Sequence, residues 1–489
     1  ASRNFINLIG DISNVDVSNT LYEGKTYDPS LSLLQFVKKT KKNFLNSNVN
    51  TMLDNLLYWA RNTSGPNKFP ILESGASGES AVVEIPFYET ITGYNLIDDI
   101  LTGPGQHTGS GTRFGWSTAL SSDGKIMAVG ATRGDGITTS EGNVQVYVLN
   151  NNKWDLREVL KGYIQGDQFG WTLALSNDGN ILVTTILYHD GVNNALRAGV
   201  VHVYEWNGTT YNKNGINATW SESSALYVHN GTSTDDHLGR SLALSGDGSV
   251  LAMGCRIGDN GVNANGRVII LKRDNNNYVH RYTTEQGNET NSSLGQSLAM
   301  SNDGNIIAIG TGLYDIVKVL IWDPLNNIYT VRWSGTKGDI EHYGYSLALN
   351  DDGNVLAIGN KYNKYNNAIN SDPNVYDWNP NTNNYEKRIS NTVYNVANNN
   401  SDDVLSVALN SDGNIITLSS TSGSNDIYVL AWNGTSWTTL LNDSNSGGSN
   451  LFGNRTLSIS SKGDIIVYGS PFYSNGILHT YIATTTDDI

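Results

Sequence analysis

The clearest candidate for a chemical role in this sequence is an aspartate that recurs at the same position of a repeated sequence phrase. It stands in the turn of six copies, as Asp123, Asp178, Asp247, Asp303, Asp352 and Asp412. Carboxylates repeated in this way could ligate a metal ion or act as acid and base. A catalytic constellation is asymmetric, whereas Asp-Gly supplies the backbone conformations of a tight turn. We therefore predict a turn-forming aspartate, with a metal or catalytic role as the alternative.

A second group of aspartates lies in loops that follow the expected second strand of a copy. Its members are Asp135, Asp190, Asp259 and Asp315. On one rim of a ring these carboxylates could gather around a ligand or bind calcium through their oxygen atoms. The alternative is that they are polar loop tips. They are the candidate metal ligands of this sequence, and no other cofactor is expected.

The aromatic residues are skewed toward amphipathic types, with 11 Trp and 26 Tyr against 9 Phe. Most tryptophans fall at the ends of expected strands, where packing between repeats accounts for them and stacking on sugars or partners is the alternative. Trp116 and Trp171 differ, because they follow the Phe-Gly of their copies where later copies have Arg240, Gln296 and Tyr345. We predict that these two tryptophans take part in an interaction.

Motifs of enzymes are absent from the sequence. It has no His-Glu-x-x-His, no Gly-x-Ser-x-Gly, no P-loop and no Rossmann fingerprint on a strand-to-helix turn. We therefore name no catalytic residue and expect a protein that is not an enzyme. The formal net charge of -15 disfavours nucleic acid and anionic membranes as partners. No run of 18 apolar residues occurs, so no transmembrane helix is expected.

The one basic cluster of this acidic chain is Lys38, Lys39, Lys41 and Lys42. It fits a solvated helix face or, alternatively, a docking patch for an acidic surface, including that of a neighbouring copy. Asn207 and Asn433 lie in Asn-x-Ser/Thr triplets within expected turns and are weak candidates for glycosylation. The number of such triplets is close to what the composition yields by chance.

The repeated phrase occurs seven times and has the alternation of a β-hairpin around its turn. A third and a fourth strand follow in most copies, which is the content of a propeller blade. The sequence thus predicts a mainly all-β fold, a seven-bladed β-propeller of four-stranded antiparallel blades in residues 94–489. The last copy has room for only three strands, and residues 94–103 resemble the fourth strand of the first copy. We predict that 94–103 complete the last blade.

Residues 1–93 lack the repeated phrase, and apolar residues between about 30 and 62 follow helical spacing. We expect a small N-terminal extension that contains α-helix and serves as an assembly or anchoring element. The numbering starts at Ala1 rather than Met, and we expect that a leader was removed.

The phrase Phe-Gly-x-Ser-x-Ala-Leu-Ser-x-Asp-Gly, clearest from Phe114 onward, resembles the FG-GAP repeat of integrin α-like seven-bladed propellers. The resemblance covers residues 104–489. It implies that the first strand of each copy lines a central channel and that the fourth is outermost. Calcium-binding FG-GAP copies carry an Asp-x-Asp-x-Asp-like loop, whereas the turns here hold too few oxygens for a calcium cage.

These observations favour a non-enzymatic structural or adhesion protein of an extracellular assembly, cell surface or virion surface. Its propeller would be an interaction platform for a glycan or surface protein, and its N-terminal segment would support self-association into an oligomer or filament. The alternative is a carbohydrate-active propeller, a lyase or hydrolase with a carboxylate pair at the channel mouth.

Overall fold

The computed structural model divides the chain into two units, residues 1–92 with 485–489, and residues 93–484. The described residues are 72–74, 80–82, 91–97, 101–102, 111–134, 141–162, 166, 168–190, 196–211, 227–230, 235–255, 265–275, 277–284, 293–311, 316–336, 340–341, 343–360, 362–363, 374–388, 404–420, 426–443, 457–471 and 476–485. In the first unit β1 (Leu72–Ser74) pairs antiparallel with β2 (Ser80–Val82). The helices expected between 30 and 62 lie outside the described residues.

The second unit is a seven-bladed β-propeller, in which each blade is an antiparallel sheet with its first strand innermost. The first two blades are β5 (Phe114–Leu120), β6 (Ile126–Ala131), β7 (Asn143–Asn150), β8 (Lys153–Lys161), and β9 (Phe169–Leu175), β10 (Ile181–Ile186), β11 (Val200–Glu205), β12 (Tyr227–Asn230). The next two are β13 (Leu238–Leu244), β14 (Val250–Cys255), β15 (Arg267–Asp274), β16 (Asn277–Thr283), and β17 (Ser297–Met300), β18 (Ile306–Gly310), β19 (Ile316–Asp323), β20 (Ile328–Thr336).

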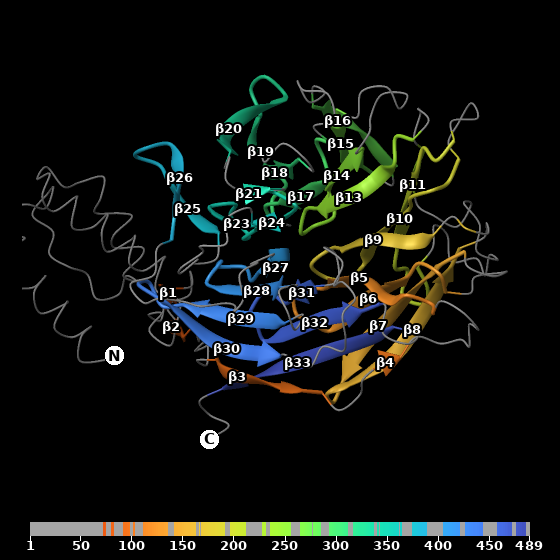
Figure 1. Cartoon of the computed structure of the whole chain (residues 1–489), viewed down its shortest axis with the longest axis horizontal. Helices are drawn as coiled ribbons and strands as arrows, with labels where there is room; N and C mark the ends of the chain where they lie inside the picture. The colour runs from red at the N-terminus through yellow and green to blue at the C-terminus, as the bar shows by residue number, and fades with distance from the viewer. Residues whose placement is uncertain are drawn as a thin grey trace, which may run out of the picture. The chain divides into compact units, whose positions relative to one another are not determined.

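The remaining blades follow the same order. They are β22 (Ser346–Leu349), β23 (Val355–Gly359), β25 (Val375–Asn379), β26 (Asn384–Lys387); β27 (Val404–Leu409), β28 (Ile415–Ser420), β29 (Ile427–Trp432), β30 (Trp437–Asp443); and β31 (Leu457–Ile459), β32 (Ile465–Ser470), β33 (Ile477–Thr485) with β3 (Ile91–Leu96). A small pair, β21 (Ile340–Glu341) with β24 (Tyr362–Asn363), accompanies the fifth blade. Figure 1 shows inner strands such as β5, β9, β27 and β31 near the middle, with β8, β16, β20 and β30 at the periphery.

The seventh blade is completed by a strand from the start of the propeller. β3 lies beside β33 in the sheet order β3-β33-β32-β31, and β4 (Leu101–Thr102) pairs with Ile477 and Leu478 of β33. Tyr94 in β3 donates its hydroxyl to the carbonyl of Gly463 at 2.5 Å. The two ends of the propeller are therefore joined by strand pairing in one sheet.

The hairpin turn of each copy is held by its own side chains. In the first copy Ser121 Oγ accepts the N–H of Ile126 and donates to Asp123 Oδ1, which also accepts the N–H of Lys125. The pattern recurs around Asp178, Asp247 and Asp303. The repeated aspartate thus serves the turn, as the composition of the phrase predicts. In the last copy Lys462 replaces it, and the hydroxyl of Ser460 donates to Asp464 instead.

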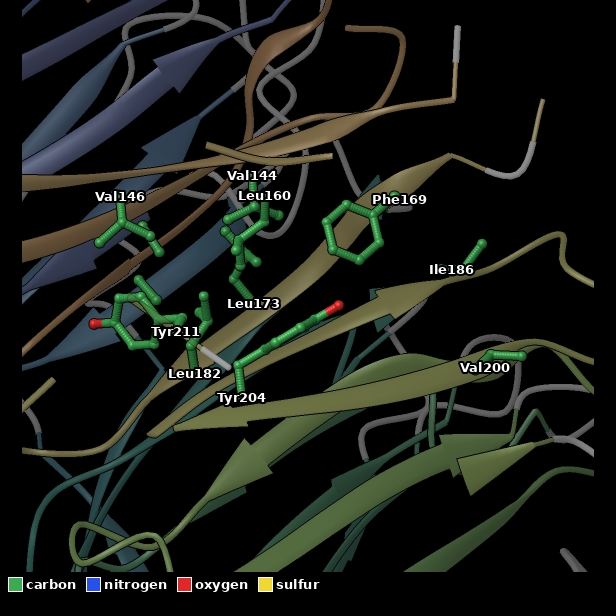
Figure 2. Packing of buried hydrophobic residues seen from close by; sticks show 12 residues of the cluster. Val144, Val146, Leu160, Phe169, Leu173, Leu182, Ile186, Val200, Tyr204 and Tyr211 are labelled. Carbon is green, nitrogen blue, oxygen red and sulfur yellow. The ribbon is translucent and has the colours of Figure 1, made fainter. Parts of the chain in front are cut away.

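The buried hydrophobic side chains of the described residues form seven clusters, each between two neighbouring blades. Figure 2 shows the cluster in which Val144 and Leu160 of the first blade meet Phe169 and Leu173 of the second. Another cluster joins Phe114 of the first blade to Val467 of the seventh, so the series closes on itself. Burial between blades, rather than within one blade, therefore stabilises the ring.

Tyrosines at the start of the outer segments connect the second to fifth blades to their own hairpin turns. Tyr278, Tyr329 and Tyr385 donate their hydroxyls to the carbonyls of the turn glycines at 2.5 to 2.6 Å, and Tyr211 does the same. Burial raises the pKa of these four tyrosines to about 12. Tyr94 of β3 makes the equivalent bond to Gly463. β3 therefore makes the same tyrosine contact that the outer segments of other blades make, as expected of the fourth strand of the seventh blade.

Arginines in β-bulges connect the outer strands of neighbouring blades. In three blades, the register between the third and fourth strands skips one residue of the fourth strand. The skipped residues are Arg157, Arg281 and Arg332. A bulge re-aims the side chain of its extra residue. Each guanidinium lies over a tryptophan of the next blade, at 3.3 to 3.9 Å from the ring centre. These tryptophans, Trp206, Trp322 and Trp378, thus pack between blades.

Candidate functional site

The innermost strands surround a cavity of about 160 Å³ on the axis of the propeller. Residues from all seven of these strands line it, among them Thr118, Thr172, Ser241, Ser297 and Leu457. Each inner strand contacts the next, and β31 contacts β5. Small-molecule sites have volumes of roughly 300 to 1,000 Å³. The cavity is smaller than that, so a ligand of this channel would be held at a mouth.

Hydroxyls on the inner strands bind neighbouring blades together. The Oγ atoms of Ser117, Ser241 and Ser297 donate to the carbonyls of Gly170, Gly295 and Gly344 in the following blade, at 2.6 to 2.8 Å. These serines are buried. The serine of the Ser-x-Ala pattern is therefore structural.

One end of the channel is bounded by a closed circle of seven backbone hydrogen bonds, which we call the turn ring. Each member donates its N–H to the carbonyl of the next, at 2.7 to 3.1 Å, and the last donates to the first. The members are Ser122, Asn177, Gly246, Asn302, Asp351, Ser411 and Ser461. Asn177 Nδ2 also donates to Asn302 Oδ1 at 2.8 Å. The hairpin turns at this end are thus joined to one another without interruption.

Asp351 is the one carboxylate of the turn ring. Burial raises the pKa of its carboxyl, and the nearby charges of Asp352 and Asp412 raise it further. The equivalent residues Asn177 and Asn302 are uncharged amides. The side chains of the turn ring therefore differ from blade to blade, although the backbone circle is continuous.

The other end carries what we call the mouth layer, formed by Trp116, Trp171, Arg240, Gln296 and Tyr345. Each directly precedes the hydroxyl residue of its inner strand, for example Thr172 and Ser241, which line the cavity. A turn presents these side chains, because the N–H of Trp116 donates to the carbonyl of Arg113 across Phe114 and Gly115. Gly115 has a φ of 82°, which position i+2 of a type II turn requires. The Phe-Gly of the phrase therefore positions the mouth layer.

The two tryptophans predicted to take part in an interaction lie side by side. Their ring centroids are 4.8 Å apart, with planes inclined at 49°. Trp171 is buried and Trp116 is partly exposed. Tyr188 meets Trp171 edge-on at 5.9 Å, and His237 meets Tyr188 edge-on at 5.6 Å. The four rings form a continuous row of aromatic contacts across the first three blades.

Arginines lie among these rings. Arg113 is 5.0 Å from the centre of the Trp116 ring, and Arg240 is 5.5 Å from that of Trp171. Burial lowers the pKa of Arg113, and the like charge of Arg133 lowers it further. Arg240 Nε also donates to Gln296 Oε1 at 3.4 Å. In the same segment as His237, Asp235 and Asp236 are engaged in ion pairs with Arg197 and Arg267.

Of the four candidate metal ligands, only Asp190 lies among the described residues. Its Oδ1 accepts the N–H of Arg197 at 2.9 Å, which is the geometry of a loop-stabilising carboxylate. Asp135, Asp259 and Asp315 lie outside the described residues. In the part of the chain that the structure describes, no group of three or more His, Cys, Asp or Glu side chains is placed to hold a metal ion.

The two sequon asparagines occupy exposed turns. Asn207 Oδ1 accepts the N–H groups of Thr209 and Thr210, and Asn433 Oδ1 accepts those of Thr435 and Ser436. Both side chains therefore stabilise the turn between the third strand and the segment that follows it. Lys38, Lys39, Lys41 and Lys42 lie outside the described residues. Among the described residues, none belongs to a helix of the length and apolarity needed to cross a membrane.

The bulge arginines and the turn ring were not anticipated from the sequence. A signal for the arginines is present, because an aromatic residue precedes Arg157, Arg281 and Arg332 by three positions in their copies. The turn ring has no comparable signal, since backbone groups form it and its side chains vary. Arg113 and Arg133 also have no counterpart in the repeated phrase, and only the structure brings them together.

No family model matches this chain, and no curated protein matches its sequence. A chain in the crystal structure of the mitotic checkpoint complex is 16% identical at a TM-score of 0.49, covering 85% of this chain and 98% of that one. The Cps50 (Swd1) β-propeller domain of Myceliophteria thermophila is 11% identical at a TM-score of 0.49, covering 80% of this chain and all of that one. At these values the likeness carries no argument about function, and the propeller is established here by its strand order.

Proposed function

We propose that this chain is a non-enzymatic interaction protein, a structural or adhesion subunit whose propeller is the binding platform. The observation that carries the proposal is the mouth layer. The inner strands repeat their serine and alanine from blade to blade, but the residue at the mouth changes to Trp, Trp, Arg, Gln and Tyr. Large aromatic residues and arginine are the side chains that dominate binding surfaces. A rigid ring holds them at one end of the channel.

We further propose that the propeller is of the FG-GAP type, that it acts in an extracellular assembly or at a cell or virion surface, and that residues 1–93 promote self-association. The phrase around Phe114, with its turn and its channel-lining strand, supports the first of these. The basic cluster Lys38, Lys39, Lys41 and Lys42 in a chain of net charge -15 supports a contact between copies.

Two measurements on the full chain test this proposal. Surface-binding assays with cells and immobilised glycans should show binding that the double variant Trp116→Ala, Trp171→Ala loses. Light scattering at rising protein concentration should show self-association that weakens when the four lysines become alanine. The matched control replaces Lys125 and Lys161, which are exposed on the propeller, by alanine. A protein that is monomeric at high concentration and binds no surface would contradict the proposal.

A further inference from the structure

The cavity on the axis of the propeller, which we call the axial cavity, is lined by uncharged residues in the described part of the chain. Serine, threonine and glutamine supply its polar groups. An aliphatic belt surrounds it, formed by the residue that follows the serine or threonine of six copies. Its members are Leu173, Leu242, Leu298, Leu347, Val407 and Leu457, and Thr118 takes this position in the first blade. A charged ligand would lose its hydration here without gaining a partner of opposite charge.

The size of the axial cavity suits one small molecule. Its volume of about 160 Å³ excludes a ligand of ordinary size, which would be held at the mouth. A ligand of about six non-hydrogen atoms, the size of benzene, occupies a cavity of roughly 150 Å³. Gln296 belongs both to the mouth layer and to the lining, so the axial cavity adjoins the mouth. A molecule of that smaller size therefore fits on the axis.

One hydroxyl of the lining departs from the structural pattern of the inner strands. Ser241 and Ser297 donate their Oγ protons to carbonyls of the following blade, at 2.7 and 2.6 Å. Ser346 has the same position in its copy and is only 5% exposed, but its Oγ makes no hydrogen bond among the described residues. A buried hydroxyl without a partner destabilises the protein, because it has given up its bonds to water. A ligand oxygen in the axial cavity would satisfy it.

The sequence of the sixth copy accounts for this departure. The acceptor of Ser297 is the carbonyl of Gly344, whose φ is 87°. The sixth copy has Val404 in place of this glycine. A β-branched residue disfavours a positive φ, because its side chain clashes with the backbone there. The sixth blade therefore does not offer Ser346 the carbonyl that other blades offer, and the hydroxyl remains for a ligand.

The hydrogen-bonding groups of the lining select alcohols. The hydroxyls of Ser241 and Ser297 have given their protons to carbonyls, so toward the axial cavity they can only accept. Ser346 can donate or accept. Alcohol groups do both, and the carbon atoms that carry them pack against the aliphatic belt. We propose that the axial cavity binds a neutral diol or triol of about six non-hydrogen atoms, with one hydroxyl bonded to Ser346.

The test is saturation-transfer NMR of the full chain, titrated at millimolar concentration with glycerol, lactate and mannitol. Glycerol has the proposed size and chemistry. Lactate has a similar size but carries a carboxylate, and mannitol repeats the chemistry of glycerol at about twice its size. Glycerol should show saturable binding. Lactate and mannitol should each bind at least about tenfold more weakly, because charge excludes one and size the other.

Two matched serine variants and one filled variant locate the site. Ser346→Ala should weaken glycerol binding about fivefold or more without lowering the urea unfolding midpoint. Ser117→Ala should lower that midpoint and leave glycerol binding unchanged, because Ser117 donates to the carbonyl of Gly170 and does not belong to the lining. The double variant Thr118→Leu, Val407→Leu introduces the leucine that the other five blades carry. It should fold and should lose saturable glycerol binding, because the added atoms occupy the axial cavity.

Each failure of the proposal gives its own result. If glycerol shows no saturable binding, water alone occupies the axial cavity and the proposal is overturned. Lactate that binds as tightly as glycerol would overturn the neutral class, and mannitol that does so would place the ligand outside the cavity. Unchanged glycerol binding by Ser346→Ala or by the filled variant would overturn the site. The surface-binding assays of the proposed function use other side chains, so either proposal can stand without the other.

Discussion

The bulge arginines show how single residues join blades that share no backbone strand. Arg332 lies 3.9 Å from the centre of the Trp378 ring and donates to the carbonyl of Gly353 and to Asn354 Oδ1. Burial lowers the pKa of its guanidinium. A partly desolvated cation over an indole contributes up to about 2 kcal/mol, and each net hydrogen bond about 1 kcal/mol. The contact is therefore a substantial part of the interface between two outer strands.

Replacing Arg332 by glutamine should lower the free energy of unfolding by about 1 to 3 kcal/mol, because the stack and the two hydrogen bonds are lost together. Urea unfolding followed by circular dichroism measures the change. Arg197→Gln is the matched control, since that side chain is 60% exposed and pairs only at the surface with Asp235. Equal effects of the two substitutions would contradict the structural role of the bulge.

Two kinds of aspartate should respond to pH with opposite signs. Burial alone would raise the pKa of Asp178, but hydrogen bonds from Ser176 and Asn180 outweigh it, so the pKa falls below its usual value. Such a group contributes stability above its unfolded pKa of about 3.9, and this contribution is lost as the pH falls through the folded pKa. Asp351 has a raised pKa, so its ionised form disfavours folding at neutral pH.

We therefore expect Asp351→Asn to raise the unfolding midpoint in urea at pH 7, with a gain that disappears as the pH falls through the raised pKa. Asp178→Asn should lower the midpoint at pH 7, and its effect should shrink as the pH falls below the unfolded pKa of about 3.9 toward the lower folded pKa. Unfolding curves at pH 7, 5 and 3 measure both. A gain from Asp351→Asn that persists at pH 3 would show that the carboxylate charge is not its cause.

At the scale of elements, most of the fold can be predicted from the sequence. Alternating residues around a repeated Asp-Gly turn specify the hairpin, and the number of copies specifies the number of blades. The fourth strand is less evident, because its start is marked only by a single aromatic residue such as Tyr278 or Tyr329. The bulge after it cannot be predicted from periodicity, since one extra residue shifts the alternation.

The candidate site can be predicted only in part. Trp116 and Trp171 stand out by comparison of the copies, because the repeat supplies a reference at each position. Tyr188, Arg113 and Arg133 lie in connecting segments outside the repeated phrase, and their proximity depends on the segments that follow β6 and β10 and precede β5. The closure of the propeller determines which loop side chains come into contact, and no local sequence pattern predicts these contacts.

The closing strand makes a prediction of its own. Tyr94→Phe removes the hydrogen bond to the carbonyl of Gly463 and should cost about 1 to 2 kcal/mol of unfolding free energy. Tyr329→Phe is the matched control, since it removes the same kind of bond from a blade built of consecutive strands. Limited proteolysis should cleave the Tyr94→Phe variant faster between β3 and β5, and leave the Tyr329→Phe variant unchanged there. Identical cleavage of both would contradict a special role of β3.

At the scale of the whole molecule, the turn ring couples all seven blades. Gly246 is its one member without a side chain, and a Cβ there would lie 1.7 Å from Asn302 Oδ1 and 2.4 Å from Asn177 Nδ2. The hydrogen bond from Asn177 Nδ2 to Asn302 Oδ1 thus passes over the third blade, where glycine leaves room for it. The backbone hydrogen bonds of the turn ring and the hydrogen bond between Asn177 and Asn302 therefore depend on each other.

Gly246→Ala should break this bridge and lower the free energy of unfolding by about 1 to 3 kcal/mol. The double variant Gly246→Ala, Asn302→Ser should recover part of the loss, because serine, which the chain uses at Ser411 and Ser461, removes the clash. Thermal unfolding by calorimetry compares the two with the parent protein. A double variant less stable than Gly246→Ala alone would contradict this account.

The pairing of β3 with β33 also determines when the protein can become complete. During synthesis β3 emerges first, and its partner follows only after the remaining six blades. At 5 to 20 residues per second, the 380 intervening residues require roughly 20 to 75 s. Throughout that interval β3 is a strand without a sheet, and afterwards β33 presents an open edge until the two meet. If two copies exchanged β3, each β33 would still have its partner strand, and the two propellers would be interlinked.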